Sequence, residues 1–125
     1  MRWFESSRPS QLLMDTLTKL IDAFARGALD EAAACFSEDG IYREPRKPVV
    51  HGRAAIASYF AAYANSGVAW RFLHEETIVA GDKACVTYRF AWAEGADGSW
   101  SERAGCAIVR VDGRGAIAMW REYEG

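Results

Sequence analysis

The second half of the chain, from residue 70 to residue 123, constrains the fold more than any other part. Residues 70–76 read WRFLHEE and residues 85–92 read CVTYRFAW, so large side chains recur at every second position. Because successive side chains of an extended strand point to opposite faces of a sheet, this period indicates β-strands. Turn signals that contain glycine separate four such stretches, at residues 81–82, 95–98 and 112–115. The pattern predicts an antiparallel meander of four strands, with the third over residues 99–111 and the last over residues 117–123.

The first half of the chain has a helical period instead. One amphipathic helix would be capped by Ser10 and ended by Gly27. The residues that share its apolar face are Leu13, Leu17, Leu20, Ile21 and Phe24. A second, short helix is predicted over residues 28–36, and a third follows His51-Gly52-Arg53. A single strand, Ile41–Pro45, lies between these two helices. This segregation of helices and strands along the chain is typical of an α+β domain.

A chain of 125 residues is long enough for one domain with a buried core. No internal repeat, linker or low-complexity segment divides it. We therefore expect a short N-terminal arm over residues 1–9 and a single domain over residues 10–125.

The formal net charge of −2, without a run of like charges, excludes the electrostatic signature of nucleic-acid or anionic-membrane binding. The apolar stretches are too short to span a bilayer, and the first residues lack the apolar segment of a signal peptide. We expect a cytoplasmic protein with no nucleic acid and no membrane among its partners.

The three cysteines, Cys35, Cys85 and Cys106, are far apart and each lies among apolar neighbours. Buried free thiols are the preferred interpretation over disulfides or catalysis. The histidines and cysteines lack the spacing of metal ligands, and no phosphate-binding or dinucleotide-binding glycine motif follows a strand. We expect neither a metal nor a cofactor.

Tyr42 and Glu44 form the first candidate site. They are two residues apart, so in an extended chain they project on the same side. If that side faces a cavity, a phenol and a carboxylate both point at its contents. Five Trp and five Tyr residues supply enough aromatic surface to line such a cavity. The pair therefore predicts a site for a small molecule.

Four segments in order resemble the SnoaL-like branch of the nuclear-transport-factor-2-like (NTF2-like) superfamily. They are LIDAFARGALD at residues 20–30, FSEDGIYREP at 36–45, HGRAAI at 51–56 and IAMWREY at 117–123. The resemblance implies an α+β cone, in which three N-terminal helices are wrapped by a curved, mostly antiparallel sheet that encloses a pocket. Members of the superfamily include isomerases, epoxide hydrolases, polyketide cyclases and binding proteins without catalysis, so the fold alone does not give the function.

The resemblance also implies roles for individual residues. Glu44 before Pro45 is similar to the general base of ketosteroid isomerases. Leu20 and Ala107 occupy the positions where those enzymes have their oxyanion donors, and neither residue can donate a hydrogen bond from its side chain.

The chain also resembles limonene epoxide hydrolases, at a different set of positions. Tyr42, Arg89 and Glu122 resemble three of its polar residues, and Ala91 takes the place of its second carboxylate. The two comparisons together imply a catalytic set of Glu44, Tyr42, Arg89 and Glu122. Arg89 and Glu122 would pair inside the pocket, because an unpaired buried charge is costly.

The same comparison assigns the strand faces. The residues expected to bind a ligand are His51, Tyr59, Trp70, Phe72, His74, Arg103 and Trp120. The residues expected on an apolar outer face are Tyr88, Phe90, Trp92, Met119 and Tyr123. Exposed apolar faces of this kind mark interfaces, so we expect a homodimer that packs sheet against sheet.

The expected function is that of a SnoaL-like small-molecule pocket protein. The preferred hypothesis is a cofactor-independent lyase, isomerase or hydrolase that applies carboxylate acid–base chemistry to a small, partly apolar substrate. The alternative is a non-catalytic ligand-binding or dimerisation module. Structural interpretations also stay open for four groups. Arg89 with Glu122 could be a buried ion pair, Glu44 a solvated carboxylate at a strand end, His51 a residue at a helix start and His74 a surface residue.

Overall fold

The computed structural model describes residues 2–94 and 96–124 of the chain. Its elements follow in the order α1 Arg2–Arg26, α2 Leu29–Ala34, β1 Phe36–Arg43, β2 Val50–His51, α3 Arg53–Ala64, β3 Trp70–Ala80, β4 Lys83–Glu94, β5 Ser99–Val111 and β6 Ile117–Glu124. This arrangement confirms the predicted α+β class.

All six strands form one sheet, in the order β2-β1-β6-β5-β4-β3. Strands β3 to β6 are the predicted antiparallel meander. β1 is parallel to β6, with Tyr42 opposite Trp120, and the short β2 pairs antiparallel with β1. The parallel pairing places the first strand beside the last, so side chains far apart in the sequence share one region of the sheet.

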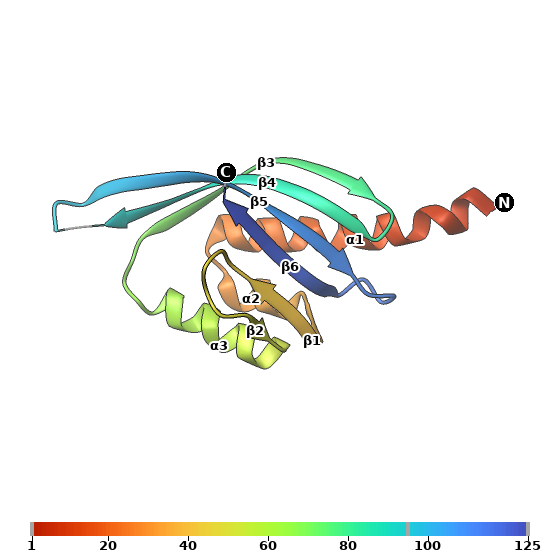
Figure 1. Cartoon of the computed structure of the whole chain (residues 1–125), viewed down its shortest axis with the longest axis horizontal. Coiled ribbons are helices and arrows are strands. Elements are labelled where there is room, and N and C mark those ends of the chain that lie inside the picture. The colour runs from red at the N-terminus through yellow and green to blue at the C-terminus, as the bar shows by residue number, and fades with distance from the viewer. Residues whose placement is uncertain (1, 95, 125) are drawn as a thin grey trace.

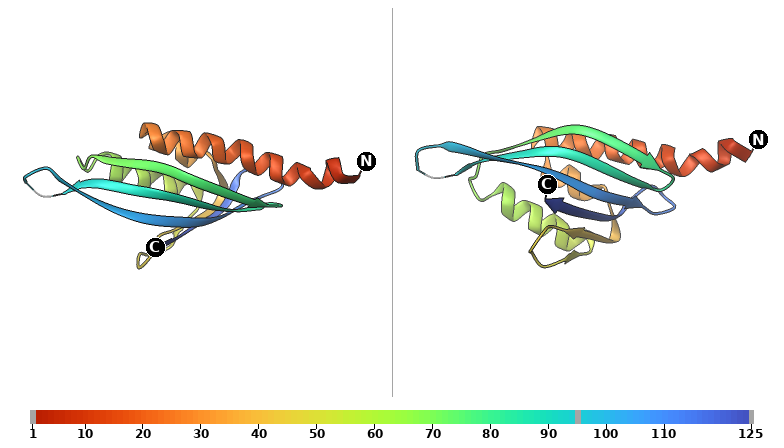
Figure 2. Two further views of the ribbon diagram at one scale, coloured as in Figure 1. Left: turned by 90° about the horizontal axis from the view of Figure 1, so that it is seen from above. Right: turned by 45° about the horizontal axis from the view of Figure 1, so that its top comes forward.

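The helices lie on one side of the curved sheet (Figure 1), and the face of the sheet toward them is called the inner face. The β4–β5 hairpin extends beyond the helices, while the N-terminal end of α1 extends at the opposite end of the molecule (Figure 2). Phe24 of α1 packs on the inner face, with ring centroids 5.1 Å from Phe72 and 5.6 Å from Trp120. Leu13 and Leu17, on the same side of α1, are fully or almost fully buried.

Helix α1 begins earlier than predicted and ends where predicted. Its backbone is helical from Arg2, so residues 2–9 continue the helix and Ser10 is not its N-cap. The Ser10 hydroxyl instead donates to the carbonyl of Gly81, at 3.1 Å. Gly27 ends the helix with φ at 74°, and its amide donates to the Phe24 carbonyl at 3.1 Å. Glycine adopts this left-handed conformation without the steric cost that other residues incur.

Strand β1 starts before the predicted Ile41. The second helix ends at Ala34, and the chain is already extended at Phe36. The pairing with β6 is irregular between Phe36 and Ile41. A Cβ atom at Gly40 would lie 2.8 Å from the Ile117 carbonyl oxygen, so the absence of a side chain permits this close approach.

The predicted faces of β4 are wrong, because Val86, Tyr88 and Phe90 lie on the inner face. Val86 and Tyr88 are buried, and Tyr88 stacks on Phe72 with centroids 4.8 Å apart. Tyr88 is opposite Gly105 in β5, where an added Cβ would lie 2.9 Å from the Tyr88 ring. Because glycine has no side chain, Gly105 leaves room for the Tyr88 ring. Trp92 shares the face of Phe90 and stacks on it, at 5.9 Å.

The side chains that alternate with these inward-facing residues lie on the opposite, outer face of the sheet. Met119 and Tyr123 lie there, as predicted, opposite Arg110 and Cys106. Its exposed large apolar side chains include Leu73, Ile78, Trp100 and Tyr123, at 51%, 61%, 45% and 41% exposure. The three cysteines are free and partly buried.

Candidate functional site

A pocket lies between the inner face of the sheet and the helices. Its volume is about 90 Å³, counted as the space that the centre of a water molecule can occupy. Its lining is mostly aromatic and comes from every helix and from most strands: Phe24, Leu29, Tyr42, Glu44, Lys47, Tyr59, Phe60, Tyr63, Trp70, Phe72, Tyr88, Phe90, Arg103 and Glu122. Apolar walls with a few convergent polar groups are typical of small-molecule sites.

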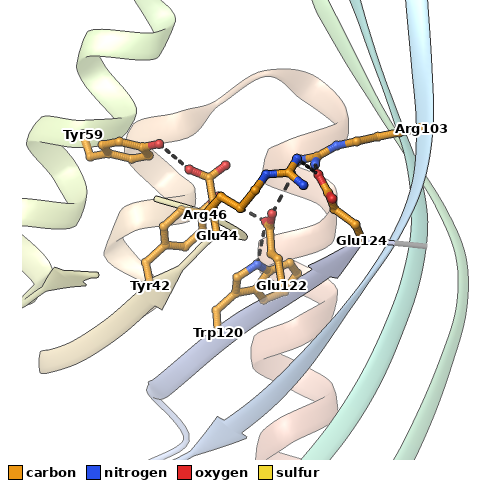
Figure 3. Close-up of polar contacts among 8 residues, drawn as sticks. All are labelled: Tyr42, Glu44, Arg46, Tyr59, Arg103, Trp120, Glu122 and Glu124. Atoms are coloured by element: carbon orange, nitrogen blue, oxygen red, sulfur yellow. Dashed lines mark hydrogen bonds and ion pairs between the residues drawn. The ribbon is translucent and has the colours of Figure 1, made fainter. Parts of the chain in front are cut away.

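Glu122 of β6 is the most buried carboxylate of the pocket, with 10% of its side chain exposed. Two donors hold its Oε2 atom: the Trp120 indole nitrogen at 2.9 Å and the Tyr42 hydroxyl at 3.1 Å. The Oε1 atom faces Arg103, whose Nη2 atom is 3.9 Å away (Figure 3). Oε2 is thus held by two hydrogen bonds, while Oε1 faces the Arg103 guanidinium across a longer distance.

This environment alters the acidity of Glu122. Burial raises its pKa above the ordinary value of 4.5, and the nearby Glu44 carboxylate raises it further. Hydrogen bonds from Trp120 and Tyr42 and the charge of Arg103 act in the opposite direction. Burial dominates because a charged carboxylate loses more solvation than these contacts restore. A carboxyl whose pKa moves toward neutrality is suited to exchange protons with a substrate.

A second carboxylate, Glu44, lies just after β1 and lines the same pocket. Its Oε1 atom accepts a hydrogen bond from the hydroxyl of Tyr59, which projects from α3 (Figure 3). The Tyr42 and Tyr59 rings lie 5.9 Å apart. Each carboxylate of the pocket is therefore held by its own tyrosine.

The tyrosines of the pocket keep their protons at neutral pH. Burial raises the pKa of Tyr42 well above 10, and the Glu122 carboxylate adds to this effect. Burial also raises the pKa of Tyr59 and of Tyr88, with Glu44 and Glu122 as the respective neighbouring charges. Neutral phenols donate hydrogen bonds, so these residues can orient carboxylates or substrate oxygens, whereas the glutamates can accept protons.

The predicted pair of Arg89 with Glu122 is wrong. Arg89 lies on the outer face, where Nη1 is 2.9 Å from Glu102 and Nε is 3.4 Å from Glu75. The guanidinium in the pocket belongs to Arg103 of β5, which was predicted as a ligand-binding residue. Arg89 is opposite Leu73 and Ala104, so the alternation of β4 turns it away from the helices.

The other predicted site residues lie either at the pocket or, in the case of the two histidines, outside it. Tyr59, Trp70 and Phe72 line the pocket, as do Tyr42 and Glu44. Trp120 lies beneath the pocket, fully buried, and reaches it through its bond to Glu122.

The two histidines lie outside the pocket. His51 is exposed in β2 beside the start of α3. His74 is exposed, and its Nε2 atom is 2.7 Å from the Thr77 hydroxyl, next to an irregularity in the β3–β4 pairing. His74 is opposite Tyr88, ahead of the register shift, but it does not line the pocket.

Several pocket residues were not predicted from the sequence. Tyr63 shares the α3 face of Ile56 and Phe60, and that pattern could have identified it. Tyr88 and Phe90 would have been predicted as pocket residues if the more apolar side of β4 had been placed inward. Lys47 has no such signal, because it lies in the irregular segment after β1.

Within residues 2–94 and 96–124, no group of three or more His, Cys, Asp or Glu side chains could hold a metal ion. In the same residues, no helix is long and apolar enough to cross a bilayer.

Comparisons with known proteins agree with the fold. The enzyme SalBIII, an epoxide hydrolase/cyclase-like enzyme in pyran ring formation in the polyether salinomycin, superposes with a TM-score of 0.79 at 16% identity, covering 93% of this chain and 92% of that one. An LEH-like epoxide hydrolase of M. tuberculosis gives a TM-score of 0.77 at 16% identity, covering 92% and 79%. An NTF2-like protein of unknown function from Burkholderia pseudomallei gives 0.78 at 16% identity, covering 91% of each chain. No curated protein was matched by sequence.

The curved sheet with its helices matches the NTF2-like fold, and identities this low support the fold alone. The sequence profile of the SnoaL-like domain matches residues 17–120. The chain belongs to the SnoaL-like family.

Proposed function

We propose that the chain is a cofactor-independent enzyme that applies carboxylate acid–base chemistry to a small, partly apolar molecule. The observation that carries the proposal is the position of Glu122, which is buried in an aromatic pocket with Oε2 held by Trp120 and Tyr42. A carboxylate fixed through one oxygen presents the other in a constant direction, which is what a general base requires.

The proposed chemistry divides the proton transfers between the two carboxylates. Glu122 would accept the proton of an attacking oxygen, from water or from a hydroxyl group of the substrate. Glu44, hydrogen-bonded by Tyr59, would first take up a proton from solvent and then deliver it to the oxygen on which negative charge develops, while Glu122 returns its proton to solvent. For an epoxide, the new C–O bond forms as the ring C–O bond breaks, so one proton is lost and one is gained.

Two structural neighbours support epoxide opening as the reaction to test first. One is described as an epoxide hydrolase and the other as an epoxide hydrolase/cyclase-like enzyme. The aromatic lining suits a hydrophobic body, and the polar groups converge on one region of the pocket. The same pair of carboxylates supports the broader proposal of lyase, isomerase or hydrolase chemistry.

The test is a turnover screen of the purified protein with styrene oxide, cyclohexene oxide and an epoxide that carries an internal hydroxyl group. Formation of a diol or a cyclic ether above the buffer rate supports the proposal. Ligand binding is followed in parallel by thermal shift, since a ligand that binds the folded state raises its apparent stability. Binding of these compounds without any turnover would favour the non-catalytic ligand-binding module instead.

We also propose that the chain forms a homodimer through the outer face of the sheet. The support is its exposed apolar residues, Leu73, Ile78 and Tyr123, and not Tyr88, Phe90 or Trp92, which face inward. Burial of such residues stabilises association in proportion to the apolar area removed from water.

Replacing Ile78 with Glu is expected to shift the protein from dimer to monomer in analytical ultracentrifugation, because it places a charge in the interface. Val49→Glu is the matched control, since Val49 is 49% exposed but lies in the loop between β1 and β2. A wild-type chain that sediments as a monomer at all concentrations would contradict the proposal.

A further inference from the structure

Arg103 lies between two carboxylates of the neighbouring strand. Glu122 and Glu124 are two residues apart on β6, and therefore share a face of the sheet. The Nη1 atom of Arg103 is 3.3 Å from Oε1 of Glu124, within hydrogen-bonding distance, whereas Nη2 is 3.9 Å from Oε1 of Glu122. The guanidinium is hydrogen-bonded to the outer carboxylate and only approaches the buried one (Figure 3).

Glu124 has a second cationic partner, which comes from another part of the chain. The Nη2 atom of Arg46, in the loop after β1, is 2.5 Å from the same Oε1 atom of Glu124. Arg46 has φ at 60°, a left-handed conformation that is uncommon for a residue with a side chain. Its side chain is 78% exposed, so this pair adds little stability of its own, but it confines the oxygen to which Arg103 binds.

We propose that Glu124 is a positioning residue for Glu122: it holds the Arg103 guanidinium at the edge of the pocket and prevents it from closing onto the Oε1 atom of Glu122. An arginine that moved onto Glu122 could form a two-point hydrogen-bonded pair, which is the strongest arrangement between these groups. Such a pair would favour the ionised carboxylate and occupy the oxygen that a substrate must reach. The catalytic meaning of this inference rests on the proposed role of Glu122.

Other groups also face Glu122. Tyr42 and Trp120 bind its Oε2 atom, and Glu44 raises its pKa, as does burial. The raised pKa values of Tyr59 and Tyr88 owe part of their shift to Glu122, so both phenols are also near it. Among these described groups, Arg103 is the one that also binds Glu124. Removing Glu124 should therefore act on Glu122 mainly through Arg103.

The experiment follows the ¹H–¹⁵N signal of the Trp120 indole between about pH 4 and pH 9, a range that brackets the shifted pKa values of buried carboxyls. This N–H group donates to Glu122, so its chemical shift reports the ionisation of that carboxyl. Trp120→Phe assigns the signal, and Glu122→Gln should abolish its titration. No substrate is needed.

We expect Glu124→Gln to lower the titration midpoint by about 0.5 pH unit or more, since a close opposite charge favours the ionised carboxylate. Arg103→Met should raise the midpoint, because it removes that charge. In an Arg103→Met background, the effect of Glu124→Gln should fall to a small fraction, as a double-mutant cycle measures. Glu102→Gln, which breaks the matched arginine–glutamate pair on the outer face, should leave the midpoint unchanged.

The inference is overturned if Glu124→Gln leaves the midpoint unchanged or raises it. It is also overturned if the same downward shift persists without Arg103, since the effect would then be that of a lost negative charge alone. Glu124→Ala repeats the removal with a different side chain, should the glutamine variant fold poorly. If Glu124→Gln lowers the midpoint through Arg103 but the wild-type protein turns over no substrate, the enzymatic proposal fails and the positioning role stands.

Discussion

Replacing Glu122 with Gln is expected to reduce turnover by about 10²- to 10⁴-fold, the usual contribution of a positioned general acid–base group. The carboxamide oxygen can still accept the hydrogen bonds of Trp120 and Tyr42, and the substitution adds no volume. The variant therefore removes the proton acceptor and keeps the pocket. The measurement is kcat/KM on the compound that the wild-type protein converts, with the folded state checked by circular dichroism.

Glu102→Gln is the matched control for this loss. Glu102 also pairs with an arginine on the same sheet, but on the outer face, with its side chain 48% exposed. Its replacement should leave kcat/KM unchanged. If Glu122→Gln keeps wild-type turnover, Glu122 is not the acid–base group, and Glu44 with Tyr59 becomes the remaining carboxylate site of the pocket.

Replacing Trp120 with Ala is expected to lower the free energy of unfolding by about 3–5 kcal/mol, as large-to-small core substitutions of aromatic residues do. Trp120 is fully buried, packs against Phe24 at 5.6 Å and Tyr88 at 6.4 Å, and donates to Glu122. Its loss leaves a cavity below the pocket and removes one of the two donors to a buried carboxylate. The measurement is urea-induced unfolding followed by circular dichroism.

Trp100→Ala provides the comparison. Trp100 is 45% exposed and has the Arg71 guanidinium 4.2 Å from its ring centroid. Exposed cation–π pairs contribute about 0.5–1 kcal/mol, so its loss should cost about that amount. Equal costs for the two substitutions would show that Trp120 does not form part of the core in solution.

The sequence pattern identified the architecture, because its periods are set by local geometry. The helical face of Leu13, Leu17 and Phe24 and the alternation of the last four strands both follow from where apolar side chains recur. The parallel pairing of β1 with β6 is a long-range contact. This pairing was not predicted, because no local pattern encodes it.

The error at β4 has a simple physical origin. A two-residue period means that a wrong choice of face moves every side chain of the strand to the opposite side. The match of Arg89 to a hydrolase pattern placed the polar side of β4 inward, although Val86, Tyr88 and Phe90 form its more apolar side. The burial of Val86 and Tyr88 shows that hydrophobicity decides the face.

The polar site was only partly accessible from the sequence. Tyr42 and Glu44 were identified by type and spacing and Glu122 by the resemblance to epoxide hydrolases, and all three line the pocket. The positions of Arg103 and Glu124 depend on the register between β5 and β6, where Gly105 is opposite Glu124. Register is a property of the assembled sheet, so the sequence could not show whether Arg89 or Arg103 lies beside Glu122.

The central claim is that Glu122 is a buried carboxyl whose proton affinity is raised for acid–base chemistry. The most direct test is a ¹³C NMR titration of its side-chain carboxyl in the wild-type protein, with the signal assigned by its absence in Glu122→Gln. Burial and the Glu44 carboxylate predict a midpoint above 4.5, the ordinary value for glutamate. A midpoint at or below that value would contradict the account, because Glu122 would then behave as a solvated or tightly paired carboxylate.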